Sequence, residues 1–226
     1  MAKYTVAVAG ATGYAGGEAL RILAAHPDFD ITCVAGHSSV GESMAKHMPH
    51  IPQLANLVVE DTTPEVLNGH DVIILALPHG LATEYAIPLL KAGVKVFDIS
   101  ADFRLKSAAK YKEYYKVDHP APELLAKAVY GLPELHREEI RAARLVGNPG
   151  CYTTCSILAA APLLRDGLAS RENVIIDAKS GVTGAGAKPS ANSHFCEVDE
   201  SLKAYNVARH RHTSEIEQEL TKAAGG

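Results

Sequence analysis

Short apolar segments alternate with segments of helical periodicity along the first hundred residues. The apolar segments span residues 4–9, 31–35, 71–77 and 94–99, and the helical ones span about 16–25 and 81–91. The apolar segments are hydrophobic almost throughout instead of alternating with polar residues, which is typical of strands covered on both faces. Strands and helices in this order predict an α/β fold with a doubly wound, Rossmann-type parallel sheet.

The pattern changes after residue 100. Helices are predicted at 105–115, 133–143 and 152–164, and one further strand at 174–178 is followed by a glycine-rich loop. Ser214 and Glu217 have the spacing of a capping box that would open a last helix running towards Ala224. We place a domain boundary near Gly147, which gives a first domain at 1–147. Residues 148–226 would begin an α+β domain, incomplete because a single strand does not make a layer.

Composition narrows the class of protein. The chain has 226 residues, of which 47% are hydrophobic, enough for one large or two modest globular domains. A net charge of −4 argues against a nucleic-acid partner. The longest apolar runs fall far short of the roughly 18 residues of a membrane span, and no secretory signal is present. Four scattered cysteines do not form a disulfide framework. We expect a soluble, cytoplasmic protein without a membrane partner.

A glycine-rich turn follows the first predicted strand and opens the first helix. Its spacing is G-x-x-G-x-x-G, and the residues that would hold a dinucleotide are Gly10, Thr12, Gly13, Tyr14, Ala15 and Gly16. Glycines let backbone N–H groups approach a pyrophosphate at the helix N-terminus, where the helix dipole favours negative charge. The alternative is an ordinary turn between a strand and a helix, but its position after the N-terminal strand favours dinucleotide binding.

The end of the second predicted strand bears on which dinucleotide binds. An NAD site would place an acidic residue there for the ribose hydroxyls. This chain has Ser38 and Ser39 instead, and no carboxylate before Glu42. NADP is therefore favoured, although the two serines could equally cap the next element.

Cys151 is the strongest candidate for a nucleophile. It follows Asn148-Pro149-Gly150 and begins a predicted helix, whose unpaired N–H groups lower the pKa of a thiol and can stabilise an oxyanion. Cys155, one turn later, is expected to be a buried small hydrophobic residue.

Removing the proton of a thiol requires a base, and the candidates that lie closest together in the sequence are His210 and His212. The neighbouring Arg209 and Arg211 are available for an anionic substrate. The same segment could also be a solvated basic stretch beside a helix. A metal site that adds His194 and Cys196 is weaker, because the spacing is not that of a zinc motif, and no metal is predicted.

Arg104 follows another strand, at the edge of the sheet where ligands bind. It could hold a phosphate or pair with a carboxylate.

These motifs occur in order along the whole chain within the segments VAGATGYAGGE (8–18), ALPHG (76–80), DISADFRL (98–105), YGLPEL (130–135), GNPGCYTT (147–154), SGVTGAG (180–186) and ARHRHTSEI (208–216). Together they resemble the semialdehyde dehydrogenase family, and within it the N-acetyl-γ-glutamyl-phosphate reductases of arginine biosynthesis. The resemblance implies an NADP-binding first domain, a second domain for substrate binding and dimerisation, and NADPH-dependent reduction of an acyl phosphate to N-acetylglutamate 5-semialdehyde.

The resemblance also assigns roles to residues. Cys151 would attack the acyl phosphate and form a thioester, His210 would be the general acid and base, and His212 would orient the substrate. Arg104 and Asn148 would bind the leaving phosphate. Pro78 would contact the cofactor, and Ser180 and Gly181 its nicotinamide end.

Two departures from the family stand out. Ser214 replaces a usual proline, which suits the start of a helix equally well. Family members, which are expected to be homo-oligomers, continue well past residue 226, so the chain is interpreted as a fragment or a natural truncation.

The alternatives to this function are a reductase of another acyl phosphate, such as aspartyl phosphate, and an NADP-binding protein without catalytic activity. The HRHTSEI segment argues against the aspartyl phosphate type.

Overall fold

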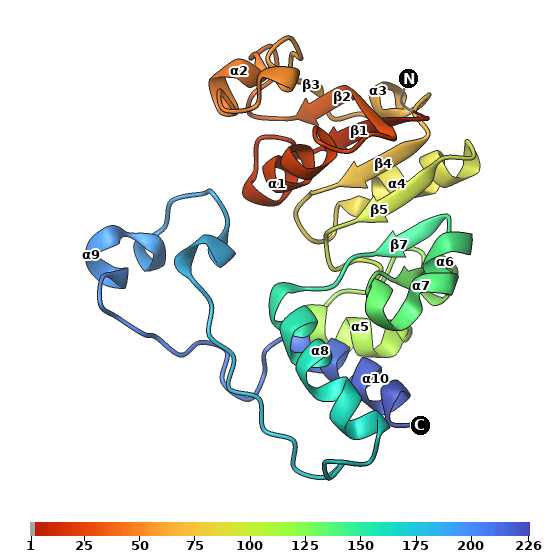
Figure 1. The fold of residues 1–226 in the computed structure, drawn as a ribbon, viewed down its shortest axis with the longest axis vertical. Coiled ribbons are helices and arrows are strands. Elements are labelled where there is room, and N and C mark those ends of the chain that lie inside the picture. The colour runs from red at the N-terminus through yellow and green to blue at the C-terminus, as the bar shows by residue number, and fades with distance from the viewer. Residues whose placement is uncertain (1–2) are drawn as a thin grey trace.

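A seven-stranded parallel sheet forms the centre of the molecule (Figure 1), in a computed structural model that describes residues 3–226. The strand order is β3-β2-β1-β4-β5-β7-β6. The strands are β1 (Tyr4–Ala9), β2 (Phe29–Gly36), β3 (Glu60–Asp61), β4 (Val72–Leu75), β5 (Lys95–Asp98), β6 (Val129–Tyr130) and β7 (Leu145–Gly147). The predicted doubly wound α/β fold is confirmed, since strands β1, β2, β4 and β5 lie within or overlap the predicted segments. Strands β3, β6 and β7 have two or three residues each, too few to show a periodicity in the sequence.

Helices connect and flank the strands. The α-helices are α1 (Tyr14–Leu23), α2 (Met44–His47), α3 (Pro64–Leu67), α4 (Ala82–Lys91), α5 (Ala108–Tyr115), α6 (Pro122–Lys127), α7 (Pro133–Ala142), α8 (Cys151–Arg165), α9 (Phe195–Val198) and α10 (His212–Ala223). Three short 3-10 helices are η1 (Pro52–Leu54), η2 (Val182–Ala185) and η3 (Ala191–Ser193).

The sheet is buried on both faces, as the apolar strands predict. Along β1, Val6 and Val8 face a cluster that includes Leu20 of α1 and Met44 of α2. The alternating residues Ala7 and Ala9 face the opposite cluster, formed with α3 and α4. Successive side chains of a strand point to opposite faces, so one strand contributes to both halves of the core.

A third apolar cluster lies beyond the β6 end of the sheet, where α8 and α10 pack side by side (Figure 1). Ile157 and Leu164 of α8 meet Leu220 of α10 and Tyr130 of β6 there. This packing brings α10 against the β6 end of the sheet, although α10 begins about 65 residues after β7 ends. The start of α8 and the start of α10 are thereby held close together.

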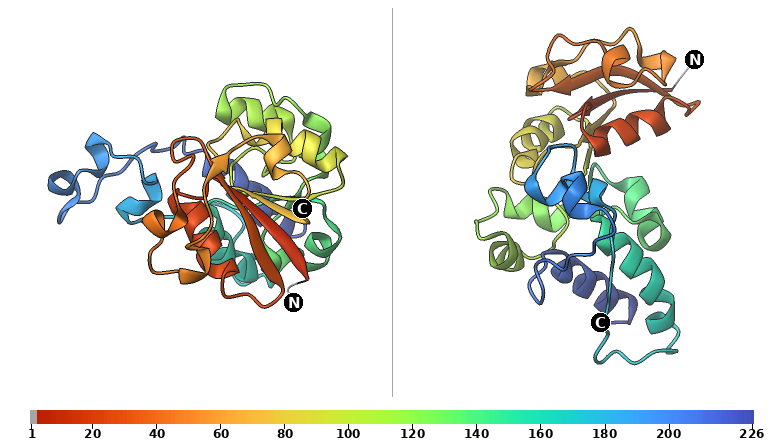
Figure 2. Two further views of the ribbon diagram at one scale, coloured as in Figure 1. Left: turned by 90° about the horizontal axis from the view of Figure 1, so that it is seen from above. Right: turned by 90° about the vertical axis from the view of Figure 1, so that its left-hand side faces the viewer.

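The chain between α8 and α10 projects away from this body (Figures 1 and 2). The strand predicted at 174–178 is wrong: these residues have no regular structure, and Ile175 is 91% exposed. A strand needs a neighbour to accept its backbone hydrogen bonds, and none of the seven strands pairs with this segment. The apolar pattern alone could not supply that partner.

Two smaller predictions are also corrected. Cys155 is exposed, not buried, and its thiol donates to the carbonyl of Tyr152 at 3.2 Å. It lies one turn after Cys151 and lines the same hollow, which explains its exposure. Ser214 does not cap α10, because the helix begins two residues earlier, at His212. Its buried hydroxyl instead donates to the carbonyl of Arg211 at 2.9 Å, so the predicted capping box with Glu217 does not form.

Candidate functional site

The glycine turn after β1 has the close backbone approach that the sequence predicts. Gly10 has φ +74°, and a Cβ there would lie 2.1 Å from the carbonyl oxygen of Ala76. A Cβ on Gly16 would lie 2.1 Å from the carbonyl oxygen of Gly10. Gly13 is the N-cap of α1 and provides no side-chain cap, so the first N–H groups of the helix remain available. A side chain at position 10 or 16 would collide with these carbonyl oxygens, so the turn can adopt this tight shape only with glycine. The unpaired N–H groups that it leaves at the start of α1 suit a pyrophosphate.

The end of β2 contains one feature that the sequence did not reveal. Ser39 is buried and its hydroxyl lies 3.2 Å from that of Thr12, whereas Ser38 is exposed. Pairing of β2 with β3 places Asp61 beside this strand end, where its carboxylate lies 3.0 Å from Nδ1 of His37. The acidic residue missing from the end of β2 is therefore present on the neighbouring strand, paired with a histidine.

Cys151 is the first residue of α8, as predicted, and it is exposed. The turn before it is held tightly. The carbonyl of Gly150 accepts hydrogen bonds from the hydroxyls of Thr153 and Thr154 at 2.6 and 2.9 Å. The N–H of Gly150 points to the carboxylate of Glu215 at 3.4 Å. The thiol is thus presented by a helix start whose backbone is fixed from both sides.

His210 and His212 lie next to each other, with ring centroids 4.7 Å apart. Nδ1 of His210 accepts the N–H of His212 at 3.1 Å, and its Nε2 lies 3.3 Å from the hydroxyl of Tyr205. The Tyr152 ring, next to Cys151 in the chain, lies 5.4 Å from that of His210. Burial, followed by the charge of Arg211, lowers the pKa of His210.

His212 is the more constrained of the two histidines. Burial, followed by the charge of Arg104, lowers its pKa to about 3, so the ring is neutral. Its Nδ1 is buried and has no hydrogen-bond partner within residues 3–226. Its Nε2 lies 2.4 Å from the position that a Cβ on Gly150 would occupy. Only glycine at position 150 lets this ring pack against the start of α8.

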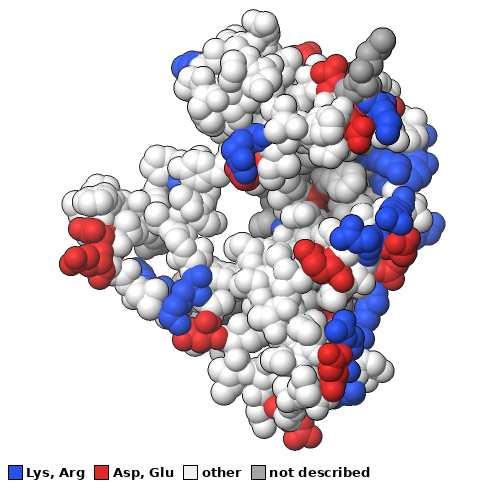
Figure 3. Space-filling view, in the orientation of Figure 1, with Lys and Arg blue, Asp and Glu red and all other residues white. Residues whose placement is uncertain are grey.

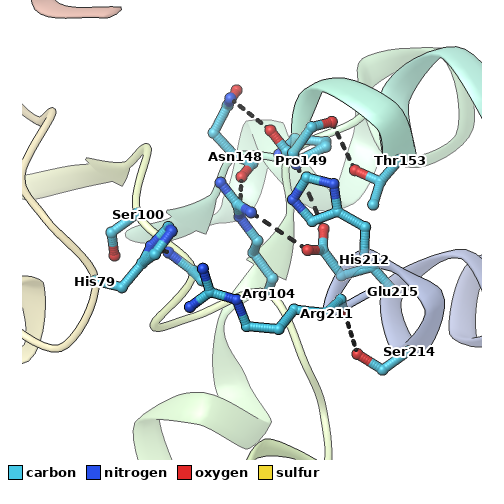
Figure 4. A network of polar contacts seen from close by, with 12 residues as sticks. His79, Ser100, Arg104, Asn148, Pro149, Thr153, Arg211, His212, Ser214 and Glu215 are labelled. Atoms are coloured by element: carbon cyan, nitrogen blue, oxygen red, sulfur yellow. Dashed lines mark hydrogen bonds and ion pairs between the residues drawn. The ribbon is translucent and has the colours of Figure 1, made fainter. Parts of the chain in front are cut away.

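Arg104 is buried and surrounded by acceptors (Figure 4). Its guanidinium donates to the carbonyls of Asn148 and Ile99 at 2.7 and 2.8 Å. It also pairs with Glu215 at 3.2 Å, where the second carboxylate oxygen accepts the hydroxyl of Tyr130 at 3.1 Å. The sequence allowed Arg104 either to hold a phosphate or to pair with a carboxylate, and in the structure it pairs with the carboxylate of Glu215. Arg104 ties the turn before Cys151 to α10.

Glu215 and Tyr130 are residues that sequence reasoning missed. A signal was present, because Glu215 and Glu219 are one helical turn apart and share a face of α10 with the apolar Leu220. Two carboxylates on a buried face require partners. The partner of Glu219 is His136, whose Nε2 lies 2.6 Å from the Glu219 carboxylate.

An open hollow lies between the projecting segment and the body, and Figure 3 shows it as a gap in the surface. The predicted residues that line it are Ala15, Arg104, Asn148, Cys151, Ser180, Gly181, His210 and His212. The others lie at the carboxyl ends of β1, β2 and β4 without lining it: Gly10, Thr12, Gly13, Tyr14, Gly16, Ser38, Ser39 and Pro78. The fold therefore brings the thiol, both histidines and the end of the glycine turn to one hollow.

Within residues 3–226, no group of three His, Cys, Asp or Glu side chains is arranged to hold a metal ion. In the same part of the chain, no helix is both long and apolar enough to cross a membrane.

Comparisons with known proteins find similar sequences over nearly the whole chain. The profile described as "Semialdehyde dehydrogenase, NAD binding domain" matches residues 5–143, and "Semialdehyde dehydrogenase, dimerisation domain" matches residues 151–226. A protein of Symbiobacterium thermophilum named N-acetyl-gamma-glutamyl-phosphate reductase is 50% identical over 97% of this chain and 64% of its own length. One of Bifidobacterium longum with the same name is 55% identical over 100% of this chain and 64% of its own. The chain thus spans just under two thirds of these relatives.

Among solved structures, aspartate semialdehyde dehydrogenase of Candida albicans with NADP has a TM-score of 0.56 at 18% identity. The match covers 72% of this chain and 47% of that protein. At this identity the likeness concerns the fold alone.

Proposed function

Because the chain belongs to the semialdehyde dehydrogenase family, we propose that it carries the cofactor site and the reacting residues of an N-acetyl-γ-glutamyl-phosphate reductase. The observation that supports this best is the exposed Cys151 at the start of α8, in the same hollow as His210 and His212. The named relatives at about 50% identity favour this substrate over aspartyl phosphate. The similarity to aspartate semialdehyde dehydrogenase, at 18% identity, concerns the fold alone.

The proposed reaction begins at the sulfur of Cys151. The thiolate attacks the carbonyl carbon of the acyl phosphate, the bond from that carbon to the phosphate oxygen breaks, and inorganic phosphate leaves. A thioester remains on Cys151. When bound, NADPH supplies the hydride that reduces this thioester to a thiohemiacetal. Collapse of the thiohemiacetal releases the semialdehyde and restores the thiolate.

The surrounding residues would serve these steps. His210 is neutral at pH 7 because burial lowers its pKa, and it would take the proton of the thiol at Nε2 and return one to the developing oxygen. This role requires the tautomer with its proton on Nδ1, and therefore release of the hydrogen bond from the N–H of His212. His212 is neutral and packed against Gly150, which suits a positioning role. The first N–H groups of α8 can stabilise the oxyanion. Arg104 and Asn148 border the same hollow. In the proposed phosphate site Asn148 would contact the phosphate, and Arg104, which is bonded to Asn148, Ile99 and Glu215, would position Asn148.

The proposed cofactor is NADP(H), held by the glycine turn at Gly10, Thr12, Gly13, Tyr14, Ala15 and Gly16. The tight glycine turn and the uncapped N–H groups at the start of α1 suit the pyrophosphate of a dinucleotide. Ser38 and Ser39 would face the adenosine end, Pro78 would contact the cofactor, and Ser180 and Gly181 would lie at its nicotinamide end. Because Asp61 is occupied by His37, it does not by itself favour NAD.

The proposal extends to organisation and location. We place the division between the cofactor unit and the substrate unit near Gly147. The match to a dimerisation profile supports a homo-oligomer. Four free cysteines suit the reducing cytoplasm, where we place the protein.

The experiment is the reverse reaction, the phosphate-dependent reduction of NADP by N-acetylglutamate 5-semialdehyde, on the 226-residue chain. Cys151→Ser should abolish turnover and leave NADPH affinity within a few-fold, as measured by fluorescence. Cys155→Ser is the matched control, since this exposed cysteine lies one turn later on the same helix. Full activity in Cys151→Ser would refute the mechanism. NADPH binding without turnover in the unaltered chain would instead support a binding protein without catalytic activity.

A further inference from the structure

Tyr115 lies between two polar side chains from distant parts of the chain. The His79 ring, from the loop after β4, meets it edge-on with centroids 6.2 Å apart. The guanidinium carbon of Arg211, at the N-terminal end of α10, lies 5.3 Å from the centre of the same ring. All three residues line the hollow, and Figure 4 shows Arg211 extending from α10 toward His79.

The hydrogen bond of His79 determines which of its nitrogens can act as a donor. Its Nδ1 accepts the backbone N–H of Ala101 at 3.0 Å, so the proton of the neutral ring must be on Nε2. Burial, followed by the charge of Arg104, lowers the pKa of His79, which keeps the ring neutral at pH 7. Nε2 has no hydrogen-bond partner within residues 3–226. His79 therefore offers one oriented N–H donor to a ligand.

Arg211 offers a positive charge and further donors. Its side chain makes no ion pair or hydrogen bond in the part of the chain that the structure describes, in contrast to Arg104. The charge of Arg104 is faced by Glu215, and three of its N–H groups are already bonded. The Tyr115 ring beneath Arg211 restricts the guanidinium without using its N–H groups. The Asp102 carboxylate, two residues before Arg104 in the chain, is buried and accepts the N–H of Gly80 at 2.7 Å.

We propose that Arg211 and His79 together bind an oxyanion of the substrate in the hollow, supplying the charge and donors that Arg104 has committed elsewhere. The inference rests on the proposed function, in which the substrate is an acyl phosphate with two such groups, its phosphate and its carboxylate. Arginine recognises phosphate and carboxylate through its planar fork of N–H donors, and the N–H of a neutral histidine adds a hydrogen bond from a second direction. Arg209, two residues earlier, does not line the hollow and is assigned no such role.

The first test is binding, by calorimetry with inorganic phosphate and with N-acetylglutamate on the full chain. Arg211→Gln should weaken binding of one of these anions about tenfold or more, as expected for loss of a charge-assisted hydrogen bond. His79→Asn retains an acceptor for the Ala101 N–H but removes the Nε2 donor, and it should weaken the same anion a few-fold. Arg209→Gln is the matched control and should leave binding unchanged.

The second test uses the reverse reaction, where phosphate and semialdehyde are separate substrates with separate KM values. A selective rise in the KM for phosphate identifies the phosphate as the ligand, and a selective rise for the semialdehyde identifies the carboxylate. In either case kcat should stay within a few-fold, and the anion should match the one found by calorimetry.

Equal behaviour of Arg211→Gln and Arg209→Gln would overturn the inference, as would a loss of kcat with both KM values unchanged. If the unaltered chain binds neither anion, the inference also fails. Because calorimetry requires no turnover, an inactive chain that still loses anion binding in Arg211→Gln would refute the reaction and support the site.

Discussion

Replacing Glu215 by glutamine should destabilise the chain far more than the same change at Glu217, two residues away on the same helix. Glu215 is fully buried, and its two oxygens meet the guanidinium of Arg104, the hydroxyl of Tyr130 and the N–H of Gly150. Glutamine is nearly the same size but carries no charge. The substitution would leave Arg104, itself only 4% exposed, without a carboxylate partner.

The magnitude follows from this burial. Breaking a buried ion pair by removing one partner costs about 3–5 kcal/mol, because the remaining charge is left uncompensated. For a chain of this size that corresponds to a fall in Tm of about 6–20 °C. The side chain of Glu217 is 58% exposed and lies 4.0 Å from Lys110, so its loss should change stability by about 0.5 kcal/mol or less.

The assay is urea and thermal unfolding followed by circular dichroism for both glutamine variants. A double-mutant cycle with Arg104→Met adds a second readout, because Glu215→Gln should cost much less once the arginine charge is also gone. Equal losses at positions 215 and 217, or no coupling between Glu215 and Arg104, would refute the role assigned to this pair. The turn before Cys151 would then be held by other contacts.

Two further predictions concern pH and the glycine turn. The hydrogen bond with Glu219 is the largest of the effects that together raise the pKa of His136. Its stabilisation is fully present below the ordinary histidine pKa of about 6.5 and is lost as pH rises through the raised value. The contribution of His136, measured as the difference in urea midpoint between the unaltered chain and His136→Gln, should therefore shrink as pH rises above about 6.5; a difference that does not change with pH would contradict this. Gly10→Ala should destabilise the chain and abolish NADPH binding, because its Cβ would lie 2.1 Å from a carbonyl oxygen. Gly41→Ala shares the positive φ but has open space, so it should cost only about 1–2 kcal/mol and leave NADPH affinity intact; equal losses would exclude the steric explanation.

Local features of the sequence were enough to predict the parallel sheet and the starts of two helices. The apolar strands, the glycine turn and the Pro-Gly turn before Cys151 depend on residues within a few positions of each other. Steric limits at glycine and proline and the periodicity of burial act at that range. The same reasoning singled out Cys151 and the histidine pair from residue type and from their places at predicted helix starts, and the structure brings all three to one hollow.

The partners of those residues depended on contacts between distant parts of the chain. Arg104 and Glu215 are 111 residues apart, and only the packing of α10 against α8 brings them together. The expected strand at 174–178 failed for the converse reason, since an apolar segment cannot form a strand without a neighbour. The free charge of Arg211 could likewise not be told from that of Arg209. A local pattern specifies what an element can be, whereas burial and pairing depend on which distant elements meet, and that only the tertiary structure decided.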